Sequence, residues 1–101
     1  MLMSNDMERM VPMRILFAED ERSLSRAVTA LLEKNNYSVD PVYDGEGALA
    51  YLGAENYDAV ILDIMMPKVD GLEVLRRLRR QGNGIPVLLL TAKSEVEDKV
   101  S

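Results

Sequence analysis

The sequence predicts an α/β domain built on a doubly wound parallel sheet. Short, mostly apolar runs recur at 15–18, 58–62 and 86–90, and such runs are typical of strands that a parallel sheet buries on both faces. The segments between them carry apolar residues at helical spacing. This alternation favours parallel strands joined by right-handed crossovers. A chain of 101 residues, 48% hydrophobic and 29% charged, has room for one such domain.

The first half of the chain predicts a strand, a helix and an edge strand. After the strand at 15–18, apolar residues recur at helical spacing until Asn35 and Asn36. The residues of this stripe are Leu24, Ala27, Val28, Leu31 and Leu32. A second strand follows at 37–42, and its Asp40 and Pro41 suit the edge of a sheet better than its centre.

The second half repeats the alternation. Asp44 and Gly45 predict a turn before a short helix, and the third strand, 58–62, closes on Asp63. Asp70 predicts the N-cap of the next helix, with Glu73 in the reciprocal position of a capping box. We expect three leucines on the inner face of that helix: Leu72, Leu75 and Leu78.

The two ends of the chain lie outside this core pattern. The fourth strand, 86–90, ends at Thr91, and Ser94 with Glu97 predicts the cap of a fourth helix. Residues 1–12 are interpreted as a disordered leader before a domain at 13–101. No apolar run has the length of a secretory signal or of a membrane span, about 20 residues for the latter, so the cytoplasm is the expected compartment.

Composition excludes several kinds of chemistry. With no cysteine and no histidine, the chain lacks thiolate or imidazole ligands for zinc, a cysteine nucleophile and the base of a Ser-His-Asp site. The formal net charge of −5 argues against direct contact with nucleic acid, because duplex affinity depends on neutralising phosphates.

Acidic residues follow two of the predicted strands. Glu19 and Asp20 come after the first strand, Asp63 closes the third, and Thr91 closes the fourth. Ligands of open α/β sheets bind at the carboxyl ends of the strands. If the first and third strands are neighbours, three carboxylates converge there, and their oxygens favour Mg²⁺, with Mn²⁺ or Ca²⁺ as alternatives.

This pocket suits phosphoryl transfer onto Asp63. A carboxylate beside a divalent ion can attack phosphorus, and Thr91 could donate its hydroxyl to a phosphoryl oxygen. The alternative is that each acid merely favours the positive end of the next helix dipole. For any single residue this alternative is stronger, but the recurrence of acids at two strand ends weakens it.

Three segments closely resemble the receiver domain of bacterial two-component response regulators. They are 15–21 (ILFAEDE), 62–67 (LDIMMP) with the following Asp70-Gly71, and 90–93 (LTAK). The resemblance covers the chain from Arg14 onwards. It implies a flavodoxin-like sheet with strand order 2-1-3-4.

The resemblance also implies a role for each residue of the pocket. Asp63 matches the phosphoacceptor, Asp20 the main acidic metal ligand, and Glu19 the acid that contacts the ion through water. Met65 matches the position whose backbone carbonyl completes the Mg²⁺ site, and Thr91 matches the switch hydroxyl. The implied phosphodonor is a sensor histidine kinase. Such domains are not enzymes in the ordinary sense, although they assist their own phosphotransfer and dephosphorylation.

The sequence departs from the family at its C-terminal end. The family continues into a fifth strand and a fifth helix, with a lysine that pairs with the phosphoryl group, whereas this sequence stops at Ser101. The winged-helix, DNA-binding output domain of the most similar subfamily is also absent. We therefore expect a truncated receiver, with a signalling-incompetent structural or interaction module as the alternative. An open edge at the fourth strand leaves pairing into a homodimer open.

Two other functions fit less well. An aspartyl-phosphate phosphatase usually has a second aspartate two residues after the nucleophile, where this chain has Met65. A flavin module needs hydroxyls and N–H groups after the first strand to bind phosphate, where this chain has three acids.

Overall fold

The computed structural model describes residues 11–90, which form four strands and three helices. In chain order they are β1 (Arg14–Ala18), α2 (Arg22–Lys34), β2 (Ser38–Val42), α3 (Gly45–Ala54), β3 (Ala59–Asp63), α4 (Gly71–Arg80) and β4 (Val87–Leu90). All strand pairs are parallel, in the order β2-β1-β3-β4. The predicted fold class and strand order are confirmed.

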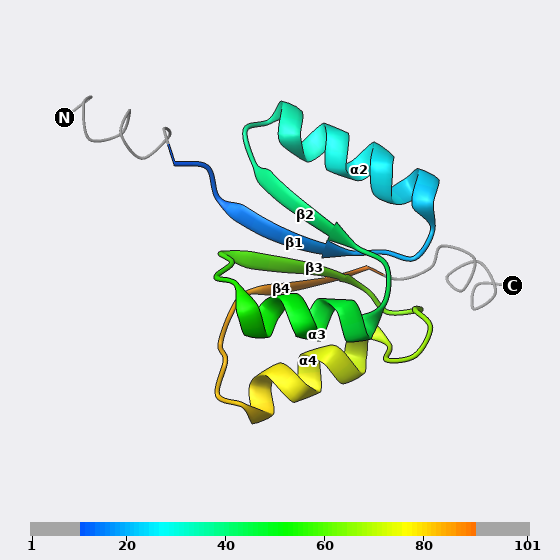
Figure 1. Cartoon of the computed structure of the whole chain (residues 1–101), viewed down its shortest axis with the longest axis vertical. Helices are drawn as coiled ribbons and strands as arrows, with labels where there is room; N and C mark the ends of the chain where they lie inside the picture. Colours follow the sequence, from blue (N-terminus) through cyan, green and yellow to red (C-terminus); the bar gives the residue numbers. More distant parts are fainter. Residues whose placement is uncertain (1–10, 91–101) are drawn as a thin grey trace, which may run out of the picture.

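The sheet is covered on both faces, with α2 on one side and α3 and α4 on the other (Figure 1). The larger core packs between the sheet, α3 and α4 around Leu16, Val60 and Leu62, which are fully buried. A smaller core contains Ile15 and Phe17 and packs against the apolar stripe of α2. Alternate residues of β1 thus enter opposite cores, as the pleat of a strand requires.

The first and last predicted boundaries fall partly outside this range. Residues 1–10 of the expected leader and Thr91, Ser94 and the fourth helix lie outside the described residues. Within residues 11–90, none of the helices combines the length and hydropathy that a membrane span requires.

The predicted inner face of α4 is wrong at one position. Leu72 is 40% exposed, whereas Gly71, Val74 and Leu78 are buried. The start of the helix sets this phase, because Asp70 caps it and Gly71 lies against the backbone of Asp63. Leu72 is one residue further round the helix, about 100° from the face that Gly71 presents to the sheet.

The predicted turn at Asp44 and Gly45 is part of a helix. Asp44 is the N-cap of α3, and its carboxylate accepts the N–H of Gly47 at 2.7 Å. Gly45 is the first residue of the helix and is buried. Asp and Gly favour turns and helix starts alike, so the dipeptide alone does not separate the two.

Candidate metal centre

Three acids meet where β1 and β3 end. Glu19 and Asp20 directly follow β1, and Asp63 is the last residue of β3. The two strands are parallel neighbours, with Ala18 opposite Leu62, so their carboxyl ends share one edge of the sheet. One carboxylate oxygen from each acid lies within 4.8 Å of the others. The predicted convergence is therefore observed, with Glu19 and Asp63 buried and Asp20 exposed.

Backbone amides orient the two buried carboxylates. The N–H of Glu21 donates to Oε2 of Glu19 at 2.9 Å. The N–H of Met65 donates to Oδ1 of Asp63 at 3.1 Å. Each carboxylate is held by the amide two residues further along, so the local chain path fixes its direction.

The electrostatics of the cluster disfavour three bare negative charges. The pKa of Glu19 lies above its ordinary value, first because the side chain is buried and then because Asp63 and Asp20 are close; the amide of Glu21 opposes this shift. Burial and like charge both penalise the ionised form. A divalent cation would relieve both penalties, and an all-oxygen donor set suits Mg²⁺, which usually takes only one or two protein carboxylates. The residues present therefore fit the ion.

The loop between β3 and α4 lies beside this cluster. Met66 packs into the larger core, whereas Met65 is 54% exposed. The loop is closed at its base, where the N–H of Gly71 donates to the carbonyl of Ile64 at 3.0 Å. A Cβ at Gly71 would lie 2.4 Å from the carbonyl oxygen of Asp63, so a glycine is required where α4 starts beside β3. The metal-binding role of the Met65 carbonyl remains a prediction.

The predicted switch hydroxyl lies just beyond the described residues. The last residue of β4, Leu90, is opposite Asp63 in the sheet, and its carbonyl accepts the N–H of Ile64 at 3.0 Å. Thr91 is the next residue in the sequence, and its role remains a prediction.

The sequence pattern did not indicate that α3 takes part in this end of the molecule. A Cβ at Gly45 would lie 1.8 Å from the carbonyl oxygen of Val69, in the loop after β3. Lys68 of the same loop lies 3.7 Å from Asp44 and 3.8 Å from Glu46. These contacts join segments more than twenty residues apart, so no local spacing could reveal them.

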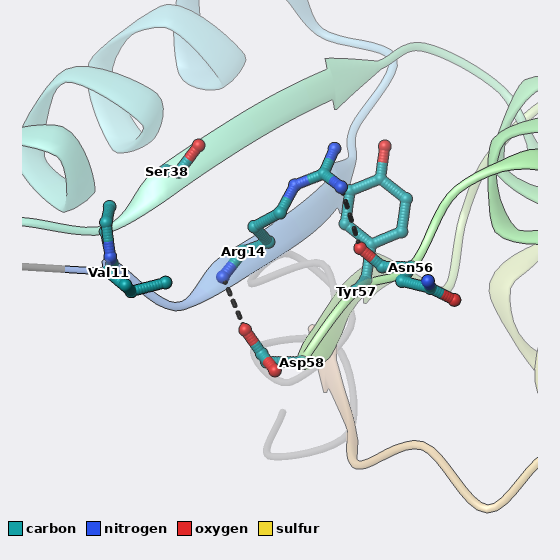
Figure 2. A pocket seen from close by; sticks show the side chains of 7 residues that line it. Val11, Arg14, Ser38, Asn56, Tyr57 and Asp58 are labelled. Atoms are coloured by element: carbon teal, nitrogen blue, oxygen red, sulfur yellow. Dashed lines mark hydrogen bonds between the residues drawn. The ribbon is translucent and has the colours of Figure 1, made fainter. Parts of the chain in front are cut away.

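A second group of acids lies at the opposite end of the sheet. There the guanidinium of Arg14 lies 3.2 Å from Asp40 and 3.5 Å from Glu55, and stacks 4.8 Å from the centre of the Tyr57 ring. Figure 2 shows Arg14 between Tyr57, the Asn56 carbonyl that it contacts at 2.9 Å, and Asp58, which accepts its backbone N–H at 2.8 Å. An open hollow of about 430 Å³ is lined in part by Arg14, Asn56, Tyr57 and Asp58.

Several transcriptional regulators are similar to this chain. It is 49% identical over 89 residues to the transcriptional regulatory protein DltR of Streptococcus agalactiae, covering 88% of this chain and 40% of that protein. It is 50% identical over 88 residues to the transcriptional regulatory protein TctD of Salmonella typhimurium, covering 87% and 39%. The chain thus spans about two fifths of the length of these relatives.

Solved receiver structures share the fold. The receiver domain of the Francisella response regulator 1452 matches with a TM-score of 0.79 and 32% identity, over 87% of this chain and 73% of that one. The response regulator TrrA of Thermotoga maritima, crystallised in complex with Mg(2+)-BeF, matches with a TM-score of 0.77 and 36% identity, over 87% and 76%. The profile of the response regulator receiver domain matches residues 15–101. By sequence and by fold, the chain belongs to the response regulator receiver domain family.

Proposed function

We propose that this chain accepts a phosphoryl group on Asp63 from the phosphohistidine of a sensor kinase, with Mg²⁺ bound beside it. The observation that carries the proposal is the convergence of Glu19, Asp20 and Asp63 within 4.8 Å at the carboxyl end of the sheet. Asp20 and Asp63 would ligate the ion directly, Glu19 through water, and Met65 through its backbone carbonyl. Manganese suits the same oxygen ligands.

The proposed step is an exchange of one bond to phosphorus for another. A carboxylate oxygen of Asp63 forms the new P–O bond while the P–N bond to the donor histidine breaks, and the electron pair stays on the imidazole, which takes up a proton. The amide of Met65 holds the carboxylate in one orientation during the attack. Thr91 would donate its hydroxyl to a phosphoryl oxygen. When bound, the ion supplies positive charge against the acids and the transferred group.

The consequence of phosphorylation would lie elsewhere in a longer protein. DltR and TctD are named transcriptional regulatory proteins, and this chain matches only 40% and 39% of their lengths. We propose that phosphorylation here controls a DNA-binding output domain in the cytoplasm, while this domain itself makes no contact with nucleic acid. A purely structural or interaction role is the competing function.

Intact-mass analysis tests the proposal directly. The chain is incubated with acetyl phosphate in the presence of Mg²⁺ or of EDTA, beside the Asp63→Asn variant and a Glu33→Gln control on the exposed side of α2. We expect one phosphoryl adduct on the wild type and on the control, and none on Asp63→Asn or with EDTA. A chain that stays unmodified with Mg²⁺ would contradict the proposal and favour the interaction role.

A further inference from the structure

The first turn of α3 touches the loop that follows β3 through backbone atoms. A Cβ at Gly45 would lie 1.8 Å from the carbonyl oxygen, 2.6 Å from the carbonyl carbon and 2.7 Å from the Cβ of Val69. Real Cβ atoms do not approach backbone this closely. Gly45 does not have a positive φ, so the contact with Val69, rather than its own conformation, requires the glycine.

The helix is a fixed support for this contact. Ala48, one turn after Gly45, is fully buried in the larger core, and Gly45 itself is buried. Asp44 caps the helix through the N–H of Gly47. Val69 packs against the same core from the loop side. The contact therefore joins two segments that are each anchored in the interior.

Charge and backbone conformation strengthen the connection. Lys68, the neighbour of Val69, has a φ of 69°, a left-handed conformation that is uncommon for a residue with a side chain. From this conformation its ammonium lies 3.7 Å from Asp44 and 3.8 Å from Glu46. The lysine side chain is 58% exposed, so each ion pair is weak by itself, and the two pairs add to the restraint that the packing at Gly45 provides.

The other end of the loop, at Met65, contacts the acidic cluster. Its closing hydrogen bond joins Gly71 to Ile64, and Met65 donates its amide to Asp63. Only residues 66–68 separate Val69 from Met65. We infer that the N-terminus of α3, through Gly45, positions this loop and thereby the amide and carbonyl of Met65 beside Asp63. Gly45 is a positioning residue, and its effect on metal binding rests on the proposed function.

Two glycines of the same helix provide a matched test. Gly45→Ala places a methyl group against Val69, whereas a Cβ at Gly53 meets no atom within 4 Å in the described part of the chain. Hydrogen exchange of the Met65 amide is measured by NMR without Mg²⁺, together with the Mg²⁺ affinity by calorimetry. We expect Gly45→Ala to speed exchange at Met65 and to weaken Mg²⁺ binding, each several-fold, and Gly53→Ala to change neither. Equal behaviour of the two variants would overturn the inference.

A second variant keeps the test informative if Gly45→Ala does not fold. Lys68→Met removes both ion pairs from the loop side, and the 58% exposed lysine side chain contributes little to the core. We expect exchange of the Met65 amide to be faster than in the wild type, but by less than in Gly45→Ala. High salt, which weakens the same ion pairs, should speed exchange in the wild type as well. Exchange that is insensitive to both changes would overturn the inference. Because exchange is measured without metal, this result is independent of whether Asp63 becomes phosphorylated, which intact mass reports separately.

Discussion

The two ends of the sheet gather acids in opposite ways. At the amino end, the guanidinium of Arg14 pairs with Asp40 and Glu55, and its backbone N–H donates to Asp58 (Figure 2). At the carboxyl end, the carboxylates of Glu19, Asp20 and Asp63 lie within 4.8 Å of one another. The first arrangement includes its counter-charge, whereas in the second burial and then the neighbouring acids raise the pKa of Glu19.

The difference separates acids whose counter-charge is an arginine of the fold from acids that would need a cation from solution. At the amino end, each contact joins β1 to a neighbouring segment: Asp40 belongs to β2, and Asn56 to Asp58 lead into β3. The hydroxyl of Tyr57 also donates to Asp40 at 2.6 Å, and burial together with this bond raises the pKa of the phenol. At the carboxyl end, burial and the neighbouring carboxylates disfavour the ionised form of Glu19, so a cation bound there would stabilise the folded state.

The largest expected effect concerns backbone packing at the two ends. Gly71→Ala places a methyl group 2.4 Å from the carbonyl oxygen of Asp63 at the carboxyl end, and such overpacking costs about 1–3 kcal/mol. Gly84 precedes β4 at the amino end, where a Cβ meets nothing within 4 Å among the described residues. Gly84→Ala should stay within about 0.5 kcal/mol of the wild type. Urea unfolding measures both, and equal losses would contradict the distinction.

The next largest effect is expected from removing the Arg14 guanidinium at the amino end. Arg14→Met removes the pairs with Asp40 and Glu55 and the bond to the Asn56 carbonyl. Because the arginine side chain is 40% exposed, solvent compensates for part of this, and we expect a loss of about 1–2 kcal/mol in the free energy of unfolding. Tyr57→Phe, which removes only the hydroxyl bond to Asp40, is the partial control. An unchanged urea midpoint for Arg14→Met would show that the network contributes nothing.

Neutralising one acid at the carboxyl end should change stability in the opposite direction from Arg14→Met. Glu19→Gln keeps an oxygen for the Glu21 amide but removes a buried charge beside Asp63. Without Mg²⁺ we expect the variant to be more stable by up to about 1 kcal/mol, and with saturating Mg²⁺ to lose that advantage. Thermal unfolding in EDTA and in Mg²⁺ measures both. A loss of stability in EDTA would mean that Glu19 stabilises the apo fold.

The pH dependence of the wild type follows from the same residue. Because the folded pKa of Glu19 exceeds the ordinary carboxyl value, the folded protein binds more protons than the unfolded chain between these two pKa values. The contribution of Glu19 to stability therefore falls as pH rises through that window and recovers as pH is lowered. In EDTA, Glu19→Gln should remove this component from the pH profile of stability.

The smallest effect is expected from Glu73, whose ion pairs lie at the surface and serve as a comparison for those of Arg14. Glu73 in the first turn of α4 accepts hydrogen bonds from Arg77 at 3.0 Å and Arg76 at 3.1 Å, which lower its pKa. Its contribution is present above the ordinary carboxyl pKa and is lost as pH falls through the lowered value. Glu73→Gln should cause a loss of stability smaller than that of Arg14→Met, and salt should weaken it. A larger loss would show that burial does not distinguish these pairs.

The two ends also differ in what the sequence could predict. The sequence correctly predicts that three acids, Glu19, Asp20 and Asp63, converge. The hydrophobic pattern shows where the strands end, and the carboxyl ends of parallel strands share one edge of the sheet. The network of Arg14, Asp40 and Tyr57 was not predicted, because it depends on strand register and on the reach of long side chains.

Helix faces and loop contacts were harder to predict than strand ends. Leu72 was assigned to the core because it is apolar, but the contact of Gly71 with Asp63 sets the rotation of α4. The sequence predicts a turn at Gly45, which is instead the first residue of α3. The contact that requires this glycine is with Val69, far along the chain, so local sequence does not reveal it. Both errors come from close backbone approaches, which leave no periodic pattern in a sequence.

The contact between Gly45 and Val69 has a consequence for the evolution and engineering of this domain. A residue larger than glycine at position 45 cannot be accepted unless the chain path at position 69 changes with it. The two positions should therefore vary together among homologues. A chimaera that takes the loop at 64–70 from another protein would need the donor's residues at 44–46 as well, because the close contact requires the two segments to match.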